Sequence, residues 1–212
     1  MTICEIDRNL YRIKIPFEKI YTTVYVVLRE EGAAVIDSGT TVEDVDTCIL
    51  PALEKLGVNE KTLKYLLLTH SHRDHAGGIS HLSACFPKAV VGASYPLNLP
   101  NRLLLQDGQI LLDGLQVVSL PGHTENSVGF LELSTCTLLS GDCLQLLGVD
   151  KYRSGIGYPA LYRQSVEKLQ HLPLKRIAAA HEYDPYGSLA EGEEAVRKYL
   201  DFCLQHDHNI AL

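Results

Sequence analysis

The sequence predicts a single α/β domain, and three observations support this prediction. Strand-like and helix-like segments alternate along the chain, which is typical of the α/β class. The coarse order of strands followed by helices occurs twice, which suggests two similar halves. Apolar residues make up 46% of 212 residues, enough for a large core, and no change in composition marks a linker. We therefore assign residues 1–212 to one domain.

Strands dominate the first part of the chain. Residues 11–15 alternate apolar and polar side chains, and Pro16 is expected to end that strand. Residues 21–28 are rich in β-branched and aromatic residues, and residues 33–36 predict the return strand. Asp37 then has two open roles: it could cap the following turn, or it could hydrogen bond to a metal-binding histidine.

A helix is predicted next, because four apolar residues recur at helical spacing: Val45, Ile49, Leu53 and Leu56. Gly57 is expected to end this helix, and Pro51 is expected to kink or split it. A strand over 64–69, a short helix over 79–86 and a buried strand over 89–93 follow. His81 lies on the short helix, so we expect it to bind a polar neighbour and not a metal.

The second half begins with a predicted surface loop over 95–106. Asp113-Gly114 predicts a hairpin between strands 109–112 and 115–120, and a second strand pair spans 128–133 and 137–139. A helix (161–172) and a small-residue strand (176–180) come next. Residues 188–191 match a capping box, which predicts the start of the last helix. That helix is expected to bury Val196, Tyr199, Leu200 and Cys203.

The segment most relevant to function is residues 66–78, where an apolar, strand-like run ends in four potential metal ligands within six positions. They are His70, His72, Asp74 and His75. Open sheets usually bind ligands at the carboxyl ends of their strands. Imidazole and carboxylate are ligands of zinc, and also of iron and manganese. A solvated histidine-rich loop is the alternative.

Three further candidate ligands follow strand-like runs later in the chain: His123, Asp142 and His181. The seven residues together supply five imidazoles and two carboxylates. That number is enough to hold two metal ions with open coordination positions, which is typical of a catalytic site and not of a closed structural site.

Four motifs, in order, resemble those of the metallo-β-lactamase superfamily. They are Thr-His-Ser-His-Arg-Asp-His-Ala-Gly-Gly at 69–78, Pro-Gly-His-Thr at 121–124, Ser-Gly-Asp at 140–142 and Ala-His at 180–181. The resemblance covers nearly the whole chain. It implies an αβ/βα four-layer sandwich of two mixed sheets flanked by helices, with the site at the edge between the sheets.

The resemblance also implies two divalent metal ions, zinc in the first place, with iron or manganese as alternatives. His70, His72 and His123 would bind the first ion. Asp74, His75 and His181 would bind the second, and Asp142 would bridge the two. Asp74 and Asp142 would be the catalytic residues, and Asp74 would orient the attacking hydroxide.

The implied activity is that of a metal-dependent hydrolase in which a metal-bridging hydroxide cleaves an ester, thioester or lactone. The pattern is similar to the glyoxalase-II-like and lactonase-like branch. Many β-lactamases of this superfamily carry cysteine in place of Asp142, so antibiotic cleavage is disfavoured. Cys143 is expected to point away from the site. Residues 146–153 match no familiar glutathione-binding sequence, which argues against a glutathione thioester as the substrate.

Two alternative activities share this scaffold: a phosphodiesterase acting on a nucleotide or nucleic acid, and a mono-iron persulfide dioxygenase. The net charge of -7 argues against a nucleic-acid partner and favours a small-molecule substrate. Tyrosines and an arginine near the later motifs could bind an acyl group or a carboxylate, or could be solvated surface residues. They are Tyr152, Arg153, Tyr158 and Tyr183.

The cysteines and the N-terminus bear on location. The six cysteines are scattered, without a C-x-x-C pair, which predicts reduced thiols in a cytoplasmic protein. The start of the chain lacks the features of a secretion signal, and no apolar stretch has the length of a membrane span. We therefore expect no membrane partner, and the oligomeric state stays open.

Overall fold

The computed structural model describes residues 2–17, 20–144, 155–183 and 187–205. These residues form two compact units, Met1–Leu105 and Gln106–Leu212. Each unit combines β-strands with helices packed on them, so the predicted α/β class is confirmed. The assignment of both units to one domain stays a prediction.

The sheet of the first unit runs in the order β1-β2-β3-β4-β5-β6-β7. The first four strands are antiparallel: β1 (Thr2–Asp7), β2 (Leu10–Phe17), β3 (Ile20–Arg29) and β4 (Gly32–Ile36). Three strands then continue parallel to β4: β5 (Leu63–Leu67), β6 (Val90–Ala93) and β7 (Arg102–Leu104). The carboxyl ends of β4 to β7 therefore lie at one edge of this sheet, and the loops that leave them are neighbours.

A helical segment of three parts follows β4: α1 (Val42–Asp44), a π-helical turn η1 (Val45–Ile49) and α2 (Leu50–Lys55). The predicted irregularity at Pro51 is confirmed, because the π-helical turn lies directly before that proline. Proline has no N–H and its ring crowds the carbonyl four residues earlier, so a wider turn relieves the clash. Gly57 ends the segment with φ +71°.

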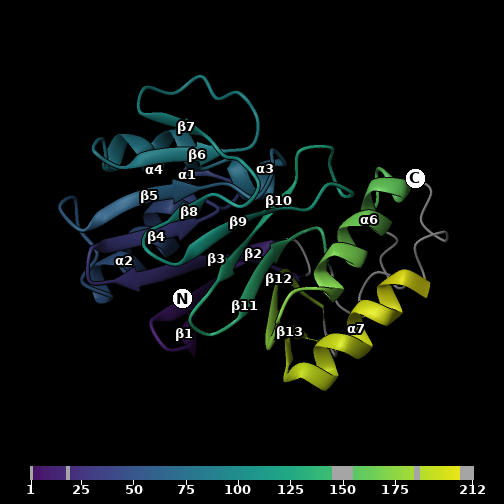
Figure 1. The fold of residues 1–212 in the computed structure, drawn as a ribbon. Coiled ribbons are helices and arrows are strands. Elements are labelled where there is room, and N and C mark those ends of the chain that lie inside the picture. Colours follow the sequence, from purple (N-terminus) through teal and green to yellow (C-terminus); the bar gives the residue numbers. More distant parts are fainter. Residues whose placement is uncertain (1, 18–19, 145–154, 184–186, 206–212) are drawn as a thin grey trace. The chain divides into compact units, whose positions relative to one another are not determined.

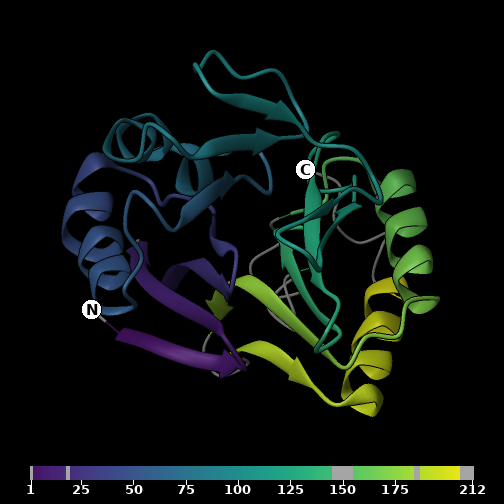
Figure 2. The same ribbon diagram turned by 60° about the vertical axis from the view of Figure 1, so that its left-hand side comes forward.

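This helical segment and α4 (Ile79–Cys85) cover the sheet of the first unit (Figure 2). Val45, Ile49 and Leu53 from the segment and Leu82 from α4 are at most 1% exposed. They pack in one core cluster with β-strand residues such as Val24, Val26 and Val35. Val24 and Val26 are two positions apart and so point to the same face of β3.

The second unit begins with an antiparallel series: β8 (Ile110–Leu111), β9 (Leu115–Ser119), β10 (Val128–Glu132) and β11 (Thr137–Gly141). β12 (Arg176–Tyr183) pairs parallel to β11, and β13 (Gly187–Glu191) pairs antiparallel to β12. The helices α6 (Pro159–Gln170) and α7 (Glu193–Gln205) lie side by side in Figure 1. The residues expected to be buried in the last helix are buried in α7.

Two predicted elements were wrong. The capping box at 188–191 is instead most of β13, because these residues pair with β12 and the ladder satisfies their backbone groups. The helix α7 starts after Gly192, which has φ +89°. The predicted loop 95–106 contains β7, which pairs with β6 although its sequence shows no alternation.

Strand ends also differ from the prediction. β2 includes Pro16 and ends at Phe17. Among the described residues of β1, none pairs with Pro16, whose partner is Tyr21 of β3, so a missing N–H is tolerated there. β5 ends at Leu67, two residues earlier than predicted, and β12 continues through His181 to Tyr183.

Among the described residues, no helix is both long and apolar enough to span a bilayer.

The turn between α3 (Arg73–Ala76) and α4 packs closely on the loop that follows β4. A Cβ atom added at Gly78 would overlap the carbonyl oxygen of Ser38, and one added at Gly77 would overlap that of Thr40. The backbone of Gly78 also donates a hydrogen bond to the Gly39 carbonyl, 3.3 Å away. Only glycine allows this approach, which joins the loops after β4 and β5.

We therefore expect Gly78→Ala to lower the free energy of unfolding by about 1–3 kcal/mol, the usual cost of overpacking. Denaturation in urea, followed by circular dichroism, measures this change. Ser80→Ala is the matched control on the same helix, since Ser80 is exposed and should change stability by less than about 0.5 kcal/mol. Equal stability of the two variants would contradict this account of the turn.

Candidate metal centre

The first group of predicted ligands lies in the loop after β5 and in the single helical turn α3. His70 follows the end of β5 by three residues, and His72 is the N-cap residue of α3. Asp74 and His75 both belong to α3. Adjacent helical residues point in directions about 100° apart, so α3 itself aims these two side chains.

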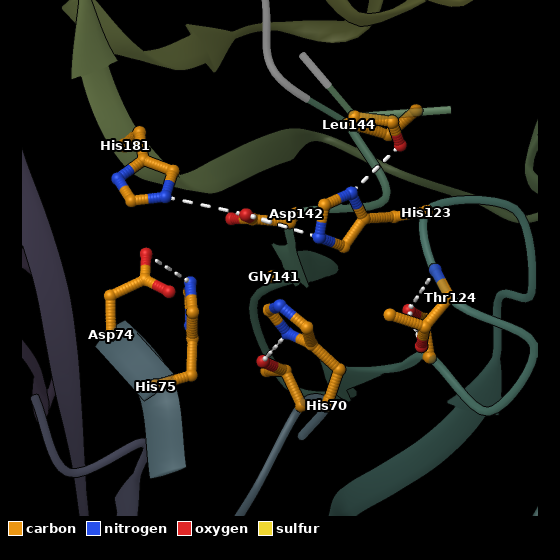
Figure 3. Close-up of polar contacts among 12 residues, drawn as sticks. His70, Asp74, His75, His123, Thr124, Gly141, Asp142, Leu144 and His181 are labelled. Atoms are coloured by element: carbon orange, nitrogen blue, oxygen red, sulfur yellow. Dashed lines mark hydrogen bonds and ion pairs between the residues drawn. The ribbon is translucent and has the colours of Figure 1, made fainter. Parts of the chain in front are cut away.

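These four side chains form a cluster within the first unit. The ring centroids of His70 and His72 are 4.7 Å apart, and those of His70 and His75 are 4.2 Å apart. Nε2 of His75 lies 3.3 Å from Oδ2 of Asp74 (Figure 3). His70 and His75 are buried, whereas His72 is exposed. The cluster thus has a buried side and a side open to solvent.

Asp37 orients this cluster through buried hydrogen bonds. Its Oδ2 lies 2.7 Å from Nδ1 of His75, and it also accepts hydrogen bonds from the backbone N–H and the hydroxyl of Thr69, each at 2.9 Å. Of the two open roles of Asp37, the structure therefore shows the hydrogen bond to a histidine. Asp37 has φ +67°, an unfavourable backbone conformation for aspartate that these contacts hold in place.

The same network sets the tautomer of His70. Its Nδ1 lies 3.1 Å from the Thr69 hydroxyl. That hydroxyl has one proton and donates it to Asp37, so Nδ1–H of His70 is the donor to the hydroxyl oxygen. His75 likewise donates Nδ1–H to the Asp37 carboxylate. Both histidines then carry a lone pair on Nε2, the form in which imidazole binds a metal ion.

The second group of ligands lies in the second unit, around Asp142. Asp142 directly follows β11, after Gly141 with φ +54°, and is 6% exposed. Nε2 of His181 lies 3.3 Å from Oδ2 of Asp142, and Nε2 of His123 lies 3.5 Å from the same oxygen. Figure 3 shows Asp142 between the two imidazoles. Three residues distant in sequence thus converge on one point.

His123 is positioned by its own hydrogen bond and by the glycine before it. Its Nδ1 lies 2.8 Å from the carbonyl oxygen of Gly155, which accepts the Nδ1–H. Gly122 has φ +154°, and a Cβ there would lie 2.7 Å from Tyr162, so a larger residue would displace this loop. Nε2 of His123 is therefore the nitrogen directed at Asp142.

Three imidazole–carboxylate pairs have separations that fit two ligands of one metal ion: His75–Asp74, His123–Asp142 and His181–Asp142. Zinc binds nitrogen and oxygen at about 2.0–2.1 Å in tetrahedral geometry, which places neighbouring ligand atoms about 3.3 Å apart. The three nitrogen–oxygen separations are 3.3, 3.3 and 3.5 Å. Direct N–H···O hydrogen bonds are shorter, near 2.9 Å. The donor set therefore suits a divalent cation, and all seven residues are among the described side chains that could hold one.

Two residues that were expected not to bind metal, His81 and Cys143, have other contacts. His81 binds Asp46 at 2.7 Å, so its expected role as the partner of a polar neighbour is confirmed. Cys143 packs in the core of the second unit, where burial, Cys203 and Asp142 raise the pKa of its thiol. It is thus directed into the core, as expected.

The predicted substrate-contacting residues are only partly described. Tyr158 is 43% exposed at the N-cap of α6, and Tyr183 lies in β12, paired with Gly187. Tyr152 and Arg153 lie outside the described residues. The role of all four in substrate binding stays a prediction.

One residue of the site was missed from the sequence. The hydroxyl of Tyr95 donates to the carbonyl oxygen of His70 at 3.2 Å. Burial, and then the charge of Asp37, raise the pKa of Tyr95 to about 12, so the hydroxyl remains a donor. The only available signal was the position of Tyr95 two residues after a parallel strand, at the edge where β5 also ends.

Comparison with known proteins agrees with this geometry. The family model of the metallo-beta-lactamase superfamily matches residues 19–99. Hydroxyacylglutathione hydrolase of Vibrio campbellii is 33% identical over 182 residues, which cover 81% of this chain and 68% of that protein. The chain belongs to the metallo-beta-lactamase superfamily.

Further relatives extend this assignment. Hydroxyacylglutathione hydrolase of Hahella chejuensis is 35% identical over 139 residues, which cover 63% of this chain and 53% of that protein. The chain thus spans between about half and two thirds of the length of these two relatives. A solved B3 metallo-beta-lactamase with an active-site glutamic acid has a TM-score of 0.75 at 18% identity, covering 99% of this chain and 90% of that one.

Membership of the superfamily confirms several predictions. The resemblance to its glyoxalase-II-like branch is confirmed by the hydroxyacylglutathione hydrolases, and the predicted metallo-β-lactamase fold by the structural similarity. The prediction of a metal-dependent hydrolase is confirmed at the level of the family. The number and kind of metal ions, and the individual ligand roles, stay predictions.

We expect Asp37→Asn to weaken metal binding about 10–100-fold, because the amide is a poorer acceptor for Nδ1–H of His75. Titration of the metal-free protein with zinc and a competing chelator measures the affinity. Asp46→Asn is a matched control, since Asp46 contacts His81 at the same distance of 2.7 Å but is half exposed. Similar zinc affinities for the two variants would refute the positioning role of Asp37.

Proposed function

We propose that the protein is a dinuclear metal-dependent hydrolase that cleaves a small-molecule thioester or a related ester, including lactones. The observation that supports this most directly is that three imidazole–carboxylate pairs have separations suited to a shared cation: His75–Asp74, His123–Asp142 and His181–Asp142. A structural zinc site would instead be closed by four protein ligands. A set of seven ligands leaves positions for water and substrate.

The ligand assignment is part of this proposal. His70, His72 and His123 would hold one ion, Asp74, His75 and His181 would hold the other, and Asp142 would be a ligand of both. The two ions are zinc in our proposal, which the nitrogen-rich ligand set favours over magnesium or calcium.

Two such cations would supply an activated water molecule and polarise the carbonyl of the substrate. The chain itself contributes the positioning. Asp74 accepts a hydrogen bond from the attacking water and so directs its lone pair to the carbonyl carbon. Asp37 and Thr69 keep His75 and His70 in one tautomer throughout the reaction.

No separate acid is needed for this reaction class. A thiol leaving group has a pKa near 8.5, about that of free cysteine, so it departs as the thiolate without being protonated. This suits a site in which every nearby histidine is committed to a metal ion. Cys143 is buried with a raised pKa, so it is not the nucleophile.

The relatives favour a thioester over the alternatives. The matched proteins are named hydroxyacylglutathione hydrolases, and the bond that such enzymes cleave is a thioester. A phosphodiesterase and a mono-iron persulfide dioxygenase are not favoured by these relatives. The segment 146–153 lies outside the described residues, so the proposal specifies a thioester and not its thiol. Tyr152, Arg153, Tyr158 and Tyr183 are proposed to contact the substrate.

A panel of substrates tests the reaction class. We expect the zinc-loaded protein to hydrolyse acyl thioesters with a higher kcat/KM than bis-aryl phosphodiesters, because a carbonyl needs one polarising cation and a stable thiolate leaves unaided. The panel should include an aryl ester and a lactone, measured at saturating zinc. A phosphodiester cleaved at least as efficiently as every acyl substrate would overturn the assignment.

The bridging role of Asp142 is tested by Asp142→Ala. This variant should bind fewer than two zinc ions per chain and lose at least about 100-fold in kcat, since it removes a ligand from both ions. Elemental analysis and steady-state kinetics measure the two effects. Asp113→Ala, at an exposed hairpin position, should change neither. An Asp142→Ala variant that retains two ions and full turnover would rule out the bridge.

A further inference from the structure

A small cavity lies at the edge of the first unit's sheet where the histidine loop also lies. It has a volume of about 280 Å³ and is lined by Tyr95, Pro96, Leu97, Arg102, Leu103 and Leu104. The first three residues lie just after β6, and the last three form β7. Because β5, β6 and β7 are parallel neighbours (Figure 1), their carboxyl ends, and the loops after them, share one edge.

Tyr95 connects the cavity to the candidate metal centre. Tyr95 lines the cavity, and its hydroxyl donates to the carbonyl oxygen of His70 at 3.2 Å. The cavity therefore begins one side chain away from the loop that carries His70 and His72. A substrate whose reacting carbonyl lies at those histidines could extend a group of a few carbons into it.

The lining of the cavity is mostly apolar. Leu97 and Tyr95 pack on the core of the first unit, while Leu104 is 57% exposed at the carboxyl end of β7. Arg102 donates to the carbonyl oxygen of Leu99 at 3.1 Å, so its guanidinium already has an acceptor beside the cavity. Such a lining suits hydrocarbon, whereas a peptide-like thiol would leave amide and charged groups without hydrogen bonds.

We propose that this cavity binds the apolar acyl chain of the substrate and so sets the acyl specificity of the enzyme. The inference rests on the proposed thioesterase function and names its substrate class: thioesters of medium-length alkyl or aryl carboxylic acids. With a volume of about 280 Å³, the cavity is slightly smaller than most small-molecule sites, which measure about 300–1,000 Å³. It can hold an acyl group but not a whole thioester.

A series of straight-chain thioesters tests this. The zinc-loaded protein is assayed with acetyl, butanoyl, hexanoyl and octanoyl thioesters of N-acetylcysteamine. We expect kcat/KM to rise by about fourfold for each buried methylene until the chain fills the cavity. Leu104→Ser should reduce this rise to less than about twofold per methylene, because a hydroxyl replaces the apolar wall.

Ile110→Ser is the matched control. Ile110 is 57% exposed, as is Leu104, but it lies in β8, outside the cavity. It should keep the chain-length dependence of the unsubstituted protein. A flat chain-length profile for the unsubstituted protein, or an unchanged slope in Leu104→Ser, would overturn the acyl subsite.

A binding experiment separates this inference from the proposed function. Sodium hexanoate should shift the methyl NMR signals of Leu97, Leu103 and Leu104 saturably, and acetate at equal concentration should not. If hexanoate binds in this way and no thioester is hydrolysed, the apolar site stands and the proposed function falls. If thioesters of every length are hydrolysed equally and no methyl signal shifts, the acyl subsite falls and the proposed function stands.

Discussion

The buried carboxylate of Asp37 is the contact on which the histidine cluster depends. A carboxylate that is 2% exposed is costly unless hydrogen bonds replace its hydration. Here the backbone and hydroxyl of Thr69 and Nδ1–H of His75 supply them. The backbone and hydroxyl of Ser38, the next residue, both donate to the His75 carbonyl, at 2.7 and 2.8 Å. The loop after β4 is thus joined to α3 at consecutive residues.

This joint explains why glycine follows the histidine motif. The loop after β4 and the start of α4 can approach only if Gly77 and Gly78 have no side chain, since a Cβ on either would overlap a carbonyl of that loop. If the approach were wider, Asp37 could not reach Nδ1 of His75. Gly77 and Gly78 therefore affect the His75 imidazole indirectly. They allow Asp37 to reach it, and Asp37 sets the direction and the tautomer of the ring.

The two units use the same device within their own sheets. In the first, the parallel pair β4 and β5 brings Asp37 to the histidine loop. In the second, the parallel pair β11 and β12 brings Asp142 to His181. Parallel neighbours end at one edge, so residues far apart in sequence meet without a long loop.

The sequence was sufficient to find the histidines and aspartates that cluster in the structure, and insufficient for the elements that carry them. The candidate ligands from His70 to His75 are close together in sequence, so they can be identified without knowledge of the fold. The ends of β5 and β12, and the strand at 187–191, depend on pairing with distant residues, which local patterns do not record. The role of Asp37 was undecidable for the same reason: His75, its partner, is 38 positions away in sequence. Tyr95 was missed because its contact is to a backbone carbonyl, which no sequence pattern marks.

The histidine cluster and the cavity proposed to bind the acyl group are built by different parts of the first unit. The histidine cluster is constrained by buried hydrogen bonds, by a residue with positive φ and by glycine contacts, so substitution there changes the geometry of several ligands together. The cavity beside it is built by Leu103 and Leu104 of the short strand β7 and by the loop after β6. Leu104 is exposed, and substitution there leaves the contacts of Asp37 intact. The acyl group that the enzyme accepts can therefore change through β7 while the ligand cluster of the first unit stays fixed.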